Sequence, residues 1–214
     1  MSADFSRTQA RRMTETAYMA ASTGLLWVAI YYLPIGDALF RLAIPLPLAL
    51  LQLRQGGRTA VEGVAVSVLL LTVLMGPVRG PLMLFPYGTL SLWLGYCWLR
   101  HWSWWASLPV GVLLGAAGFL VRVALVSVLL GENLWVVITG AAAGIVDGLA
   151  DRLQLPLSPD LTQVQLVALA LVLAQNLIYV LALHAVAWWV FPRLRQSMPD
   201  PPPLLRPLLA LESS

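Results

Sequence analysis

Lysine is absent from this sequence, and charge of either sign is scarce. Charged residues make up 11% of the 214 residues, and all 13 basic residues are arginine. A soluble domain usually carries about a quarter charged residues. The arginines are dispersed between apolar segments, which argues against a nucleic-acid-binding surface. Because 59% of the residues are hydrophobic, the composition indicates an integral membrane protein built from helices packed in a bilayer.

The sequence also lacks the motifs of common membrane enzymes and nucleotide-driven pumps. It has no phosphate-binding loop, no HExxH or GxSxG motif and no pair of carboxylates arranged for a metal. We therefore expect no enzymatic activity, no cofactor and no metal site. The single cysteine, Cys97, cannot form an internal disulfide. No second metal ligand stands near His184 at a suitable spacing, so we interpret this residue as a buried histidine with satisfied hydrogen bonds.

Long apolar runs recur along the whole chain. About 20 apolar residues cross a bilayer as a helix, and such runs lie at 14–33, 38–53, 59–76, 81–99, 106–130 and 163–191. A shorter glycine-rich run at 135–150 contains Asp147. We predict an all-α bundle of six transmembrane helices over 14–191, with a short helical or re-entrant outer segment between the fifth and sixth. Residues 1–13 form a cytoplasmic segment, and the proline-rich tail 192–214 is predicted to be extended or disordered.

The arginines predict the orientation of this bundle. With six crossings and a cytoplasmic N-terminus, nine arginines face the cytoplasm and only two, Arg79 and Arg152, face outward. This bias follows the positive-inside rule. If 135–150 also crossed, Arg193 and Arg195 would face outward, so six crossings are favoured over seven. Both termini are then cytoplasmic, in a bacterial inner membrane or a thylakoid membrane. The tryptophan-rich turn at 98–105 is expected at the inner interface.

Prolines interrupt two of the predicted spans. Pro45 and Pro47 lie in the middle of the second span, where each removes a helical hydrogen bond. We predict a broken crossing there, covered by protein or lining a cavity. A re-entrant loop is the alternative, but it would move Arg54 and Arg58 outside. Pro86 is expected to kink the fourth span, after a tight outer turn at 76–81.

Arg122 lies inside an apolar run from 106 to 130 that holds no other charge. A cation at this depth costs at least about 2.5–3.5 kcal/mol, so it faces the bundle interior, a wet cavity or a carboxylate. We predict Asp147 as its partner, and Arg41 with Asp37 as a second pair. Two interpretations stay open for the first pair: a structural ion pair, or part of a site for an anionic substrate. Asn176, beside Gln175 and Tyr179, is predicted either to bridge helices or to line the same cavity.

Glycines recur every fourth residue in the run "GAAAGIVDG". Gly140, Gly144 and Gly148 share one helical face, and such faces allow close packing between helices in lipid. Two interpretations remain for this face. The face either packs against a neighbouring helix in the ordinary way or forms a thin cover over a pocket. If the protein is an assembly factor, the same face would bind a partner protein.

The order of these features resembles a known family. An Ala17-x-x-x-Ala21 face, the outer turn "PIGDALFRLAIPLPLALL", a glycine turn and four further spans are similar to the substrate-binding S components of energy-coupling-factor (ECF) transporters. More narrowly, the chain resembles the YybS-like membrane proteins over residues 14–191. The resemblance implies that Ala17 and Ala21 dock a coupling membrane subunit, which carries partner ATPases. It also implies an outer pocket for a small-molecule ligand, near Arg41, Arg122 and Asp147.

Two functions follow as hypotheses. In the first, the chain is the substrate-binding subunit of an importer and reorients when docked to partner subunits. In the second, it is a structural or assembly factor of a membrane complex, such as a photosynthetic one, and Arg122 is purely structural. A self-contained secondary transporter is a third hypothesis, which six spans without an internal repeat make weaker.

Overall fold

The computed structural model describes residues 2–153 and 160–203, except for the side chains of 2–6, 146, 147, 149–151 and 153. Every regular element in these residues is helical, which confirms the predicted all-α class. In chain order the elements are α1 (Ser2–Tyr32), α2 (Asp37–Ala43), α3 (Pro45–Gln55), α4 (Gly57–Met75), η1 (Pro81–Met83), η2 (Leu84–Gly88), α5 (Thr89–Leu99), α6 (Trp104–Leu130), α7 (Leu134–Leu153), α8 (Leu161–Val190) and η3 (Pro192–Leu194).

Four segments of the described chain are long and apolar enough to cross a membrane: Gly57–Met75, Pro81–Leu99, Trp104–Leu130 and Leu161–Val190. They agree with the last four predicted spans to within two residues at either end. The first two predicted spans are not among them, so the count of six stays a prediction. α1 is one continuous helix from Ser2. The helix runs through residue 13 without interruption, and the membrane boundary expected there stays a prediction.

The proline-containing second span forms the centre of the bundle. α3 packs against α1, α4 and α5, and its residues from Leu48 to Gln52 are all buried. The structure divides the span at Ile44, immediately before Pro45, as the prolines predict. Ile44 keeps helical backbone angles, so the interruption is slight. The predicted cover is also present, because protein surrounds α3 on several sides.

The kink predicted at Pro86 is also found. Phe85, inside η2, has an extended backbone (φ −115°, ψ 122°), which interrupts the helical path between η1 and the regular helix α5. The preceding turn is tight: the Gly80 N–H donates to the Gly76 carbonyl at 3.2 Å. The kink brings η2 against α6, where Pro86 contacts Gly118. This contact places Pro86 and Tyr87 on the wall of the cavity described below.

Polar side chains join three helices at the end of the bundle that is predicted to be cytoplasmic. Arg12 on α1 pairs with Glu62 on α4 at 3.1 Å, and Arg58 pairs with the same carboxylate at 3.5 Å. Gln55, at the end of α3, donates to Glu15 on α1 at 2.6 Å. These contacts fix the end of α3 and the beginning of α4 against the first half of α1.

Aromatic residues fill the core where α5, α6 and α8 meet. Trp98 and Trp104 are each 1% exposed and pack their rings on His184. His184 is fully buried and is satisfied as predicted: Nε2 lies 2.8 Å from the Ser107 hydroxyl, and Nδ1 lies 2.8 Å from the Val180 carbonyl. Two tryptophans of the turn expected at the inner interface therefore belong to the core of the bundle, and the position of this turn at the interface stays a prediction. Tryptophan spacing alone does not separate these two environments.

The beginning of the tail is not disordered. It has no regular secondary structure from residue 196 to residue 202, and its prolines 199, 201 and 202 are buried. The Pro199 carbonyl accepts a hydrogen bond from Trp104 Nε1 at 3.2 Å, which holds this segment against the core. Proline removes backbone donors but leaves carbonyls available, so such a segment can still be anchored. Residues 204–214 lie outside the described residues.

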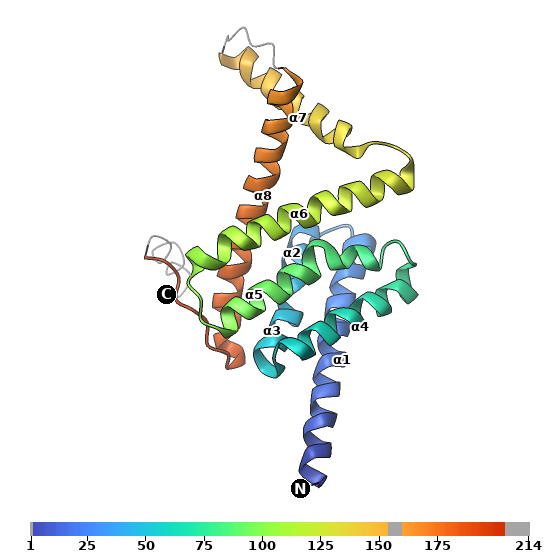
Figure 1. The fold of residues 1–214 in the computed structure, drawn as a ribbon, viewed down its shortest axis with the longest axis vertical. Helices are drawn as coiled ribbons and strands as arrows, with labels where there is room; N and C mark the ends of the chain where they lie inside the picture. The colour runs from blue at the N-terminus through green and yellow to red at the C-terminus, as the bar shows by residue number, and fades with distance from the viewer. Residues whose placement is uncertain (1, 154–159, 204–214) are drawn as a thin grey trace.

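α7 and the beginning of α8 project away from the bundle (Figure 1). The predicted short or re-entrant segment is instead a continuous helix of 20 residues, and its apolar part is Leu134–Ile145. A small cluster of Ala142, Val164 and Ala168 joins α7 to α8. By contrast, α6 packs on α8 through a glycine-rich face inside the bundle. α8 begins with a capping box between Asp160 and Gln163.

Candidate functional site

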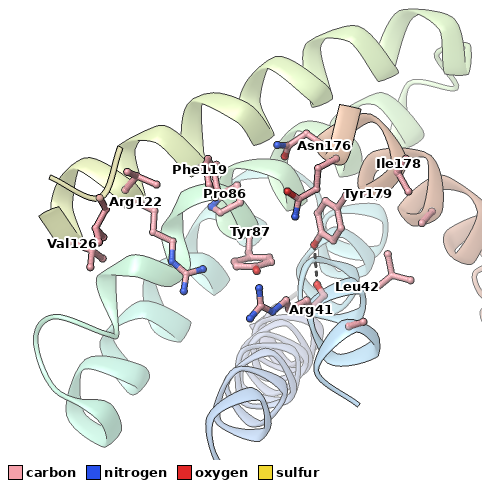
Figure 2. A pocket seen from close by; sticks show the side chains of 15 residues that line it. Arg41, Leu42, Pro86, Tyr87, Phe119, Arg122, Val126, Asn176, Ile178 and Tyr179 are labelled. Carbon is pink, nitrogen blue, oxygen red and sulfur yellow. Dashed lines mark hydrogen bonds between the residues drawn. The ribbon is translucent and has the colours of Figure 1, made fainter. Parts of the chain in front are cut away.

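A cavity of about 620 Å³ lies between α2, η2, α6 and α8. Figure 2 shows side chains from these elements pointing into one space, with α6 on one side and α2 opposite. Most of its wall is apolar, but Arg41, Arg122, Gln175, Asn176 and the two tyrosine residues 87 and 179 also line it. Small-molecule sites commonly have this size and this combination of an apolar wall with few polar groups. Three of the four predicted substrate-binding residues, Arg41, Arg122 and Asn176, therefore share one cavity.

Arg122 reaches from α6 toward α1. Its guanidinium carbon lies 5.7 Å from the centroid of the Trp27 ring, within range of a cation–π interaction. Among the side chains that the structure describes, no carboxylate lies within 4 Å of this guanidinium. The predicted partner, Asp147, lies on α7, and its side chain is outside the described part of the structure. The Arg122–Asp147 pair therefore stays a prediction, whereas the contact with Trp27 is an observed one.

The second predicted pair is present on α2. Arg41 Nε donates to Asp37 Oδ1 at 2.9 Å, one helical turn away, and about half of each side chain is exposed. The helix break before α3 also leaves a backbone carbonyl free to form a hydrogen bond across the cavity. Pro45 has no N–H to donate to the Arg41 carbonyl four residues earlier. The Tyr179 hydroxyl donates to that carbonyl instead, at 2.8 Å, and so ties α8 to α2 across the cavity (Figure 2).

A second, smaller cavity adjoins the first. Its volume is about 220 Å³, and it is lined by Trp27, Ile30, Tyr31, Asp37, Arg41, Tyr87 and Arg122. Arg41, Tyr87 and Arg122 belong to the walls of both cavities. Tyr87 is 6% exposed, and its ring packs edge-on against Trp27, with centroids 5.5 Å apart. The two guanidinium groups thus stand at the boundary between a larger apolar space and a smaller polar one.

Asn176 combines packing with a position on the cavity wall. Its Nδ2 donates to the Val172 carbonyl at 2.8 Å, and its amide lies directly against Gly115 on α6. A Cβ at residue 115 would collide with the Asn176 amide oxygen, so this crossing requires glycine. Of the two alternatives predicted for residues 175, 176 and 179, the structure places all three on the wall of the cavity. Any role of Asn176 in ligand binding stays a prediction.

The predicted docking residues lie outside the cavity. Ala17 is exposed on α1 and lines a separate groove of about 550 Å³ with Arg12 and Glu62. Ala21 is half-buried one turn later. On α7, Gly140 and Gly144 are exposed, and a Cβ at either position would meet nothing within 4 Å. Both faces are therefore open in this chain, and their use for docking stays a prediction.

Sequence reasoning missed several residues that shape the site. Tyr87, Trp27 and Phe119 line the two cavities but carry no motif. The glycines of α6 did carry a signal: the run "GVLLGAAG" places Gly111, Gly115 and Gly118 on one face. A Cβ on Gly111 would lie 3.0 Å from Val180 on α8, and one on Gly118 would lie 2.7 Å from Pro86. The small-residue rule predicts close packing at this face of α6.

Comparison with known proteins places the chain in a family. No curated protein and no solved structure matches it. A family model described as "Predicted membrane protein (DUF2232)" matches residues 21–206, which include every helix that lines the cavity and the docked part of the tail. The match covers most of the sequence and agrees with the YybS-like resemblance. The chain belongs to the DUF2232 family of predicted membrane proteins.

Proposed function

We propose that this chain is the substrate-binding membrane subunit of an ECF-type importer and captures a small molecule in the cavity between α2, η2, α6 and α8. The observation that carries the proposal is the cavity itself, about 620 Å³ with two guanidinium groups on a mostly apolar wall. An arginine within a membrane segment is costly to keep and marks a functional site by default. The chain acts by binding alone, without catalysis or a cofactor.

The topology we propose has six crossings, with α1 and the α2–α3 pair as the first two and both termini in the cytoplasm. The polar network of Arg12, Glu15 and Glu62 then lies at the cytoplasmic end. Trp27 and Tyr31 lie about 20 Å farther along α1, given a rise of about 1.5 Å per residue. This separation supports an outer position for the cavity, where a substrate enters from outside the cell or from the thylakoid lumen.

Energy must come from partners under this proposal, because the sequence has no phosphate-binding loop. We propose a coupling membrane subunit with attached ATPases, docked against the side of α1 that carries the exposed Ala17 and the half-buried Ala21. The groove beside Ala17 supports this choice, since small residues at an open helix face allow close approach of another helix. Ala17 precedes Trp27 by ten residues, about 15 Å along α1, and the groove beside Ala17 shares no lining residue with either cavity, so both can be occupied together.

The alternative proposal is a non-enzymatic structural or assembly factor of a membrane complex. One observation favours it: the glycine face of α7 has no neighbour within the described chain, although α7 projects beside an apolar stretch of α8. In this alternative, Gly140 and Gly144 dock another membrane protein, and Arg122 serves only the packing around Trp27.

Native purification in a mild detergent, followed by mass spectrometry of proteins and small molecules, tests the two proposals together. An importer subunit should retain a small molecule that is lost in Arg122→Ala, while the variant melts at the same temperature as the wild type. Ala17→Leu should lose the coupling subunit but keep the molecule. The importer would be rejected and the assembly role supported if no small molecule is bound and subunits of another complex copurify in a way that depends on Gly140 and Gly144.

A further inference from the structure

We infer that the ligand is an amphipathic anion, with its charged group in the smaller cavity between Arg41 and Arg122 and its apolar body in the larger one. This inference rests on the proposed binding function and adds the chemical class of the ligand. It comes from the way two adjoining cavities of different character share three wall residues.

The smaller cavity is suited to the charged group. Among the described residues that line it, two guanidinium groups face one carboxylate, Asp37, so its wall carries a net charge of +1. Arg41 already uses Nε on Asp37, but no ion pair within 4 Å engages the Arg122 guanidinium in the described chain. A planar guanidinium offers paired donors that match a carboxylate or a phosphate. An anion in the smaller cavity would neutralise the positive charge of Arg122 within the membrane.

The aromatic rings make the headgroup space narrow and fixed. Trp27 is 1% exposed and holds edge-on contacts with Tyr31 and Tyr87, at centroid distances of 5.7 and 5.5 Å. A volume of about 220 Å³ is below the usual range of about 300–1,000 Å³ for a drug-sized site. The space therefore suits a compact headgroup, and the remainder of the ligand must lie elsewhere.

The larger cavity supplies that remaining space. Beyond the shared arginines, its wall includes Leu42, Phe119, Val123, Val126, Ile178 and Ala182 from three different helices. These side chains offer no hydrogen bonds, so a polar group beside them would be poorly solvated. Of the polar side chains on the same wall, Asn176 and Tyr179 already donate to backbone carbonyls of the protein. An alkyl or ring system is the matching occupant. Each methylene transferred from water to such a wall contributes roughly fourfold in affinity.

Binding of decyl phosphate to the full chain in phosphatidylcholine nanodiscs tests this inference, with empty nanodiscs subtracted. Inorganic phosphate supplies the charged group alone, and decanol supplies the apolar body alone. We expect decyl phosphate to bind at least tenfold more tightly than either. Arg122→Gln and Arg41→Gln should each weaken decyl phosphate binding at least tenfold and leave decanol unchanged. Arg100→Gln, which removes the same charge at the α5–α6 turn, should change it less than twofold.

Two results would overturn the inference: equal affinity for decanol and decyl phosphate, or equal affinity of Arg122→Gln and wild type for decyl phosphate. The comparison of the three probes uses wild-type protein and so holds even if a variant fails to fold. A neutral molecule copurified in the cavity would reject the anionic class but leave the importer proposal standing. If no probe binds and nothing copurifies, both proposals fail.

The same nanodiscs distinguish the two sources of such a ligand. Dioleoyl phosphatidate added to the bilayer displaces decyl phosphate if the natural ligand is a lipid of the surrounding membrane. If phosphatidate does not compete while decyl phosphate still binds, the ligand enters from water. Either result supports an amphipathic anion, and the second also agrees with import from outside.

Discussion

Two helices of this protein carry nearly the same glycine spacing and use it in opposite ways. On α6, Gly111, Gly115 and Gly118 are buried, and a Cβ on any of them would press on α8 or Pro86. On α7, Gly140 and Gly144 are exposed, and a Cβ would meet open space. The spacing of small residues therefore identifies a face that permits close packing, but it does not tell which neighbour fills that face.

The α6 face also determines where the cavity lies. Close approach at Gly115 and Gly118 brings α6 onto Asn176 and Pro86, both of which line the cavity. Four residues beyond Gly118, Arg122 is half-buried and turns toward Trp27. The tight contact thus ends where the cavity begins. On α7 no such contact exists in the described chain, and the first half of α8 beside it is largely exposed.

The largest expected effect comes from filling the α6 face. Gly118→Leu places side-chain atoms where an ideal Cβ already lies 2.7 Å from Pro86 Cα, and the rigid backbone there cannot yield easily. Overpacking of this kind typically costs about 1–3 kcal/mol and sometimes more. We expect a loss of folded protein by size-exclusion chromatography in detergent. The control is Ala117→Leu at the neighbouring exposed position, and equal behaviour of the two variants would contradict the close contact.

A somewhat smaller effect is expected from a cavity in the bundle core. Leu183 on α8 is fully buried among the aromatic residues of α5 and α6, so Leu183→Ala should destabilise the protein by about 2–4 kcal/mol. Leu166→Ala truncates a leucine that is 61% exposed on the same helix and should change stability by less than about 1 kcal/mol. Thermal melting of both variants measures the difference. Similar melting temperatures would mean that the two halves of α8 are equally packed.

The sequence alone predicts the parts of this fold that depend on long apolar runs. The predicted span 81–99 coincides with Pro81–Leu99, and the other three long spans agree with their predictions to within two residues at either end, because the length of apolar chain needed to cross a membrane is a strong constraint. The prolines of the second span also predicted its interruption correctly. The length of α7 was underestimated, since glycines and Asp147 resemble a loop in composition but are tolerated in a helix.

The site was predictable in part, and the reason differs from residue to residue. Arg122 and Arg41 can be identified as site residues from the sequence alone, because a charged side chain within an apolar run is energetically costly and therefore indicates a function. Their surroundings are not found this way, since the Trp27 contact joins residues 95 positions apart in the chain. Tyr179 on the Arg41 carbonyl is the instructive case. Pro45 predicts that this carbonyl lacks its helical donor, but only the fold identifies Tyr179 as the replacement.

A moderate effect is expected from that replacement hydrogen bond. Tyr179→Phe leaves the Arg41 carbonyl without either donor, and the loss of one such bond costs about 1 kcal/mol. Because the bond ties α2 to α8 across the cavity, decyl phosphate binding should weaken by severalfold as well. Tyr18→Phe removes a hydroxyl from a tyrosine that is 69% exposed and serves as the control. Unchanged melting and binding in Tyr179→Phe would show that water satisfies the carbonyl equally well.

The smallest effect on stability is expected on α7, where the comparison between the two glycine faces is sharpest. Gly144→Leu meets no atom within 4 Å, so the unfolding free energy should change by less than about 1 kcal/mol. Any change should be toward greater stability, because leucine favours helix more than glycine does. A marked loss in thermal melting would contradict the open face. With stability unchanged, copurification decides what the face does: a partner protein lost in Gly144→Leu but kept in Ala17→Leu identifies α7 as the docking helix, and the opposite pattern identifies α1.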